Sequence, residues 1–300
     1  MLPECRKLRA ELKEARKIIL PLVQKRRSLK QKALDAGQPV PQFNDALDWA
    51  EQEAAEKGSK FDPVVFQLTL SLLAIHTTYD LLEQAIIDLA RNPQYIEPLR
   101  QEALQVLQAH GWKKTSLYNM KLLDSALKET QRLKPGSIGM KLVFVELSPA
   151  TADVLQVTMR RYVMEDLRLS NGLVLKKGTR LNVDNRRMSD RDIYENPETY
   201  DPYRFHKMRS KPGRENASQL VSTSPDHLGF GHGEHSCPGR FFAANEIKVA
   251  LCHILLKYDW KLAPETDTSP DMKGMLAKAS PVAKILIRRL EKTEIDIDSF

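Results

Sequence analysis

The stretch Phe230-Gly-His-Gly-Glu-His-Ser-Cys-Pro-Gly239 carries the most specific pattern in this 300-residue sequence. Cys237 stands between two glycines and just before a predicted helix whose first turn contains Pro238, so the helix N-terminus would stabilise a thiolate there. Gly233 and Gly239 permit unusual backbone angles and a close approach to a flat ligand, and Phe230 can pack beside the sulfur. The pattern indicates a cysteine with a chemical role.

Two other interpretations of the same stretch stay open on the residues alone. It can be a glycine-rich turn around a buried cysteine. It can also be a zinc site made of His232, His235 and Cys237. A structural zinc site needs a fourth ligand, and the sequence has no second Cys or His pair at finger-like spacing.

Three further patterns lie upstream of the cysteine. Glu129-Thr-Gln-Arg132 places a carboxylate and a guanidinium on one helix face, where they can pair, and a solvated ion pair is the default interpretation. Pro202-Tyr-Arg-Phe205 supplies a third charged residue, Arg204. In Ala74-Ile-His-Thr77, the threonine can bond the carbonyl four residues earlier and bend the helix locally.

Together, and in their order along the chain, the four patterns resemble those of the cytochromes P450. Phe-x-x-Gly-x-x-x-Cys-x-Gly is similar to the family's haem-thiolate signature, which implies haem b with Cys237 as the axial iron ligand. Phe230, Gly233 and Gly239 would then surround the cofactor. His235 replaces the arginine that usually contacts a haem propionate.

The resemblance also implies roles for the upstream residues. Glu129, Arg132 and Arg204 would form a buried network that holds the loop under the haem, and such a network must be complete because an unpaired buried charge is costly. Thr77 would assist oxygen activation. His76 stands where most members have Asp or Glu, so a proton relay there needs imidazole or water.

The expected fold is mainly α with a small β region, as a partial cytochrome P450 fold that starts near helices F and G. Residues 1–300 are expected to be the C-terminal part of a single domain, without the N-terminal part that carries the membrane anchor. Residues 140–157 are predicted to be an insertion, either a translated intron or a surplus loop. Joining 139 to 158 puts Arg161 where the family has a propionate-binding arginine, with Arg160 as the competing candidate.

Local patterns predict the elements. An apolar stripe from Leu8 to Leu22 predicts a helix that Pro21 kinks or ends, and further helices are expected from Asn44 to Gly58, from Asp62-Pro63 to Asn92-Pro93, over 98–109 and from Ser116 or Asn119 to Lys134. Leu167 to Leu175 predicts an alternating hairpin around Asn171-Gly172. A final helix opens at Pro238.

Composition limits the function classes. The net charge of +7 is scattered in pairs, which indicates solvated faces or a basic surface for an acidic protein or anionic lipid, and no nucleic-acid-binding signature accompanies it. Three cysteines argue against a disulfide framework. No secretory signal opens the chain, and the apolar segment 64–74 is too short to span a bilayer and is expected to be a buried helix.

The resemblance therefore implies a monooxygenase that oxidises a lipophilic small molecule with O2 and electrons from an NADPH-cytochrome P450 reductase. His76 and His235 are typical of a fungal secondary-metabolism branch that includes diterpenoid and indole-diterpene oxidases. The full-length protein is expected at the endoplasmic reticulum membrane, on its cytoplasmic face, and this chain would touch a membrane only through the missing anchor. The alternative is a truncated, non-catalytic haem-binding or scaffold protein.

Overall fold

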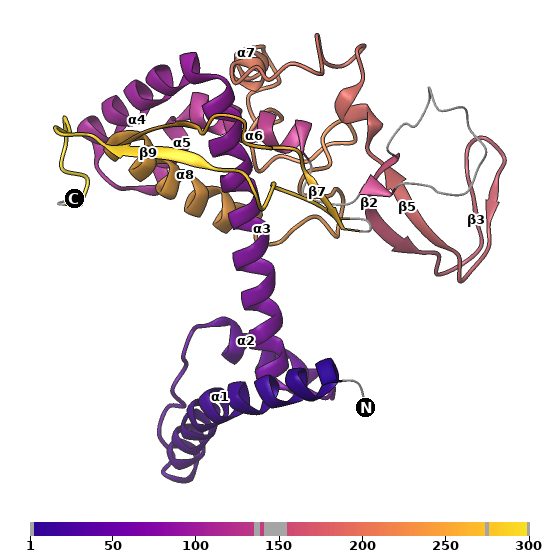
Figure 1. The fold of residues 1–300 in the computed structure, drawn as a ribbon. Coiled ribbons are helices and arrows are strands. Elements are labelled where there is room, and N and C mark those ends of the chain that lie inside the picture. Colours follow the sequence, from indigo (N-terminus) through magenta and orange to yellow (C-terminus); the bar gives the residue numbers. More distant parts are fainter. Residues whose placement is uncertain (1–2, 135–138, 141–154, 274–275, 299–300) are drawn as a thin grey trace. The chain divides into compact units, whose positions relative to one another are not determined.

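The computed structural model describes residues 3–134, 139–140, 155–273 and 276–298, which form two compact units, Met1–His76 and Thr77–Phe300 (Figure 1). The division falls inside one long helix, α3. Each unit is described by itself.

Helices dominate the described residues. They are α1 (Pro3–Asp35), α2 (Ala46–Glu56), α3 (Pro63–Arg91), α4 (Ile96–His110), α5 (Lys114–Asn119), α6 (Lys121–Leu133), α7 (Arg204–Arg209) and α8 (Arg240–Lys257), with short 3-10 turns at Pro93–Tyr95 and Arg186–Ser189. The strands are short: β1 (Gly139–Met140), β2 (Leu155–Tyr162), β3 (Leu167–Arg168), β4 (Val174–Leu175), β5 (Arg180–Asp184), β6 (Tyr258–Leu262), β7 (Asp271–Lys273), β8 (Leu276–Lys278) and β9 (Ile285–Arg289). The expected class, mainly α with a small β region, is confirmed.

The first unit packs α1 against α2 through opposite charges. Arg26 pairs with Asp45 at 2.6 Å and lies 4.5 Å from the Phe43 ring centroid, and Arg27 pairs with Glu51 at 2.5 Å. Asp45 also caps α2 by accepting the Asp48 amide at 3.1 Å. Basic residues on one helix therefore meet acidic residues on the next.

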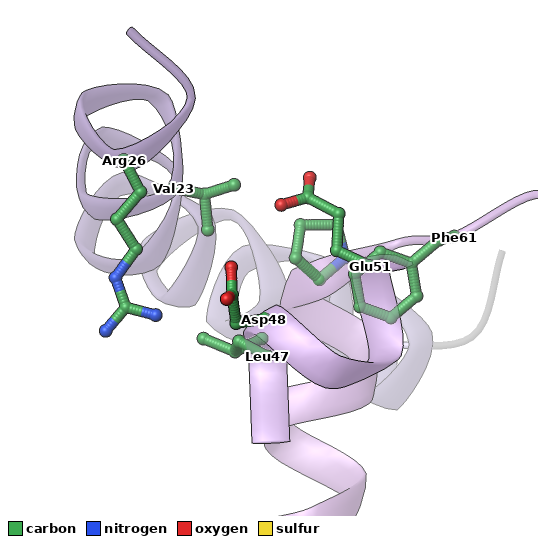
Figure 2. A pocket seen from close by; sticks show the side chains of 7 residues that line it. Val23, Arg26, Leu47, Asp48, Glu51 and Phe61 are labelled. Atoms are coloured by element: carbon green, nitrogen blue, oxygen red, sulfur yellow. The ribbon is translucent and has the colours of Figure 1, made fainter. Parts of the chain in front are cut away.

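A small pocket lies between these helices, lined by Val23, Arg26, Leu47, Asp48, Glu51, Phe61 and Pro63. Figure 2 shows the α1 side chains facing those of α2 across it. Its volume is about 10 Å³, which is close to the minimum for one water molecule. It is not a ligand site.

The second unit is built around α6. Every residue of α6 from Leu122 to Arg132 is buried, its apolar side chains packing with those of α4 and α8 in one hydrophobic cluster. Glu102 of α4 accepts the amides of Leu122 and Leu123 at 2.7 and 2.8 Å, which satisfies unpaired donors at the start of α6. A helix buried on all sides must also bury its charged residues, and these build the candidate site.

The described strands form four separate antiparallel sheets beside this core. The largest has the order β1-β2-β5, with a register irregularity between Thr158 and Arg161 that coincides with a φ of 46° at Met159. The predicted hairpin is present as β3 and β4, with Leu167 opposite Leu175 and Gly172 at φ 87°. Its leucines do not form a buried face, because Leu167 and Leu173 are half exposed.

Three expectations need correction. α1 continues through Pro21 to Asp35, so the proline does not end the helix. α8 begins at Arg240, with Gly239 as its N-cap, so Pro238 precedes the helix. The apolar segment 64–74 is not a buried helix, because large side chains such as Leu72 and Leu73 are more than half exposed.

α3 is long and apolar enough to cross a bilayer, by length and composition alone, and it is the one such helix among the described residues. A core helix has the same properties. The predicted insertion 140–157 lies mostly outside the described residues, which include only Met140 and 155–157 of it, in β1 and β2.

Candidate functional site

The cysteine loop, residues 228–239, folds back on itself before α8. The Gly231 amide donates to Leu228 O at 2.8 Å, and the Cys237 amide donates to Phe230 O at 2.8 Å. Gly231 and Gly233 have φ angles of 71° and 76°, a region that favours glycine. The loop thus presents a half-buried, unoxidised Cys237 three residues before the first turn of α8.

The residues expected around Cys237 are placed in this loop. Phe230 is half-buried and packs against the hydrophobic core, while Gly233, His235 and Gly239 are exposed. A Cβ at Gly233 would meet nothing within 4 Å, and one at Gly239 would lie 4.0 Å from the Cys237 sulfur. The loop therefore has an open side next to the cysteine.

Strand β2 passes beside the loop. Arg161 Nη2 donates to His232 O at 3.5 Å, and the Met159 side chain lies near Gly231. The register irregularity of β2 lies in this same stretch, between Thr158 and Arg161. Arg161, the expected propionate contact, is thus next to the cysteine loop; the Arg160 side chain lies outside the described atoms.

Behind the loop, the structure brings Glu129, Arg132 and Arg204 together. Arg132 donates twice to the Glu129 carboxylate, at 2.8 Å each, and Arg204 Nε donates to Glu129 Oε1 at 3.0 Å. Glu129 and Arg132 are fully buried and Arg204 is 9% exposed. The Asp201 amide adds a fourth donor to the same carboxylate, at 3.2 Å.

The remaining guanidinium donors of this network hold the irregular segment 188–199. Arg132 donates to Met188 O and Pro197 O at 2.7 Å each, and Arg204 donates to the carbonyls of Glu195, Asn196 and Thr199. Such complete satisfaction is what allows three charges to be buried. Tyr194 lies 5.1 Å from the Arg132 guanidinium, and burial raises the pKa of its phenol, so it stays neutral.

His76 and Thr77 are adjacent on α3, and both side chains are exposed. The division between the two units falls between them. Their expected part in oxygen chemistry stays a prediction.

The zinc interpretation has no support in the geometry. Within the part of the chain that the structure describes, no three His, Cys, Asp or Glu side chains converge as a metal site. His232 Nδ1 lies 3.2 Å from Thr223 Oγ1, and His235 is exposed. Cys237 is therefore a candidate for a cofactor that needs one protein ligand.

Two charged residues near the loop were missed from the sequence. Arg240 donates to Cys237 O at 2.8 Å and to Val221 O at 3.2 Å. Lys128 is 1% exposed and donates to two carbonyls. The sequence signal for each residue was its position: Arg240 directly follows Cys237-Pro-Gly239, and Lys128 directly precedes Glu129.

Comparison with known families decides what this arrangement is. The sequence profile described as "Cytochrome P450" matches residues 1–142 and 151–287. The chain belongs to the cytochrome P450 family. The match is interrupted between residues 142 and 151, within the segment 140–157 proposed as an insertion.

Individual relatives agree with this assignment. "Cytochrome P450 monooygenase 2" of Gibberella fujikuroi is 64% identical over 300 residues, which cover 99% of this chain and 59% of the relative. "Cytochrome P450 monooxygenase hepE" of Aspergillus oryzae is 50% identical over 96% of this chain and 49% of its own length. "Cytochrome P450 monooxygenase olcG" of Penicillium canescens is 45% identical over 97% and 55%. The chain spans about half to three fifths of the length of these three P450 relatives.

Members of the P450 family hold haem iron through a cysteine thiolate. The residues present here fit that group. Cys237 offers a single soft ligand at a helix N-terminus, on a loop whose glycine side is open. Arg161 adds a cation beside the same loop, where an anionic substituent of the cofactor can be paired.

Proposed function

We propose that this P450 chain is the haem-binding part of a monooxygenase that oxidises a lipophilic small molecule. The observation that carries the proposal is the cysteine loop, which its own backbone hydrogen bonds close around a half-buried Cys237 and which packs through Gly229 on α6, the helix of the buried Glu129 and Arg132. A loop fixed in this way can hold one thiolate at a constant position. The names of the relatives, all P450 monooxygenases, support the same reaction class.

The roles of the residues follow from their places. Cys237 would hold the iron from the loop that directly precedes α8. Arg161 and His235 would pair with haem propionates, and Phe230 would pack beside the sulfur. The bound haem would supply oxygen activation and electron transfer. Thr77 Oγ1 and the His76 imidazole would hold and pass protons during oxygen activation.

The proposed substrate is a lipophilic secondary metabolite of terpenoid type, because His76 and His235 resemble the residues of fungal terpenoid oxidases at these positions. Electrons would come from an NADPH-dependent reductase, and the complete protein would be held at the cytoplasmic face of the endoplasmic reticulum. The organisms of the three relatives support a fungal type of metabolism.

Haem loading and turnover test this proposal separately. The purified chain, expressed with a haem precursor, is expected to carry about one haem per chain, while Cys237→Ala carries less and binds it without a thiolate. Turnover is then measured as NADPH-dependent oxidation of a terpenoid substrate with added reductase. A chain that binds no haem contradicts the proposal.

A second candidate function is that of a haem-binding or scaffold protein without turnover. Haem binding through Cys237 with no oxidation of substrate, under conditions where a full-length relative turns over, would favour this candidate.

A further inference from the structure

A second buried polar network lies beside the first and involves a lysine that the family motifs do not include. Lys128 is on α6, directly before Glu129, and its side chain is 1% exposed. Its ammonium donates to Gln219 O and Ser222 O, at 2.8 Å each, and lies 5.2 Å from the Phe205 ring centroid. The hydrogen-bond acceptors are backbone carbonyls, the Phe205 ring face adds a cation–π contact, and Asp124 on the same helix adds a favourable charge interaction.

The carbonyl acceptors belong to one short segment, Gln219–Thr223, which we call the strap. The strap is bound to α6 at a third point, because the Leu220 amide donates to Asp124 Oδ2 at 2.8 Å. Leu220 itself is fully buried. Residues 219, 220 and 222 therefore fix the strap to α6.

The two other strap residues, Val221 and Thr223, contact Arg240 of α8 and the cysteine loop, respectively. Arg240 donates from Nε to Val221 O at 3.2 Å and from Nη1 to Cys237 O at 2.8 Å. Thr223 Oγ1 lies 3.2 Å from Nδ1 of His232, a residue of the loop. One guanidinium thus joins the strap to the backbone of the cysteine itself.

We propose that Lys128 and Arg240 are positioning residues for Cys237 and are coupled to each other through the strap. The inference rests on the proposed function, because the position of the sulfur matters only if Cys237 holds the cofactor. Lys128 fixes the strap on α6, and Arg240 transfers that position to the carbonyl of Cys237. The buried Glu129 network holds a different segment, 188–199, and not the strap.

A double-mutant cycle on the haem-free chain tests the coupling. In a Cys5→Ser background, the rate at which iodoacetamide alkylates Cys237 is measured by peptide mass spectrometry in Lys128→Met, Arg240→Met and the double variant. Each single change should raise the rate by roughly five- to tenfold by loosening the loop, and the double variant should be no faster than the faster single one. Rates that multiply, or a wild-type rate in Lys128→Met, would overturn the proposal.

The matched control is Lys134→Met. Lys134 caps the same helix, is partly buried and pairs with Asp88. Its removal should leave Cys237 alkylation within about twofold of wild type and combine multiplicatively with Arg240→Met. An effect of Lys134→Met equal to that of Lys128→Met would show that any loss of stability exposes Cys237, and would contradict a specific role for the strap.

Two further readouts keep the test decisive. If Lys128→Met does not fold, the hydrogen-exchange rate of the Leu220 amide is measured in Arg240→Met instead. Exchange faster than in the wild type shows that the change at Arg240 reaches the contact of the strap with α6. An unchanged rate refutes the coupling. In the haem-loaded chain, Lys128→Met should increase the share of reduced carbon monoxide complex that lacks thiolate ligation. A wild-type chain that takes up no haem would contradict the proposed function, while the alkylation cycle would still decide the strap.

Discussion

Glu129 accepts two hydrogen bonds from Arg132, one helical turn further along α6, at 2.8 Å each, with both side chains fully buried. Arg204 adds a second cation to the same carboxylate. The carboxylate is therefore shared between two guanidinium groups. Its removal leaves both of them without a counter-ion.

Glu129→Gln should accordingly destabilise the chain by about 3–5 kcal/mol, the usual effect of breaking a buried ion pair. Glu97→Gln is the matched control, because Glu97 also pairs with an arginine at i+3 but is exposed, and about 0–1 kcal/mol is expected there. Urea unfolding followed by circular dichroism measures both. Equal losses of unfolding free energy in the two variants would show that the buried network stabilises the chain no more than the exposed pair does.

Gly229→Ala tests how closely the cysteine loop approaches α6. A Cβ at position 229 would overlap the side chain of Gln131, which lies between Glu129 and Arg132. Overpacking of this kind costs about 1–3 kcal/mol. The double variant Gly229→Ala with Gln131→Ala should recover most of that loss in the same unfolding assay, and failure to recover would place the strain elsewhere.

Stability should depend on pH through Lys128. Burial lowers the pKa of its ammonium to about 7, from an ordinary value near 10.5, and Asp124 opposes that shift. The unfolded chain binds the Lys128 proton more tightly than the folded chain does. The contribution of Lys128 to stability is therefore present above the unfolded pKa, and it is lost as the pH falls to the folded pKa of about 7. The wild type should gain stability relative to Lys128→Met between pH 7 and pH 10. A difference between the two that does not change with pH would contradict this.

Cys5 and Cys252 should react at different rates. Cys252 is fully buried, and burial raises the pKa of its thiol to about 12, whereas Cys5 is exposed. A neutral, buried thiol is a poor nucleophile. Alkylation at pH 8 should modify Cys5 first and Cys252 only when urea unfolds the chain. Fast modification of Cys252 in the folded chain would show that the core around α8 opens locally.

Much of the fold could be predicted where the signal is local. The ends of α3 lie within one residue of Asp62-Pro63 and Asn92-Pro93, because capping and proline geometry act on the backbone directly. The pairing of Glu129 with Arg132 follows from helical spacing. The approach of Arg204 to this pair was expected only from the family resemblance, since nothing local joins residues 129 and 204.

The features that were missed depend on distant partners. β2 departs from a regular alternation at Met159, so its pairing with β5 has no simple period-two pattern. Lys128 is held by carbonyls about 90 positions further along the chain, and backbone acceptors leave no trace in the sequence. The exposed apolar face of α3 was predicted to be buried, because hydropathy records the preference of a side chain and not whether a partner is present.

The most direct test of the central claim is the carbon monoxide difference spectrum of the reduced, haem-loaded chain. If Cys237 is the axial ligand, the wild type should show the red-shifted Soret band of a thiolate-ligated haem, and Cys237→Ala should lose it. A chain that binds haem with no such band, or a Cys237→Ala variant that keeps the band, would contradict the account.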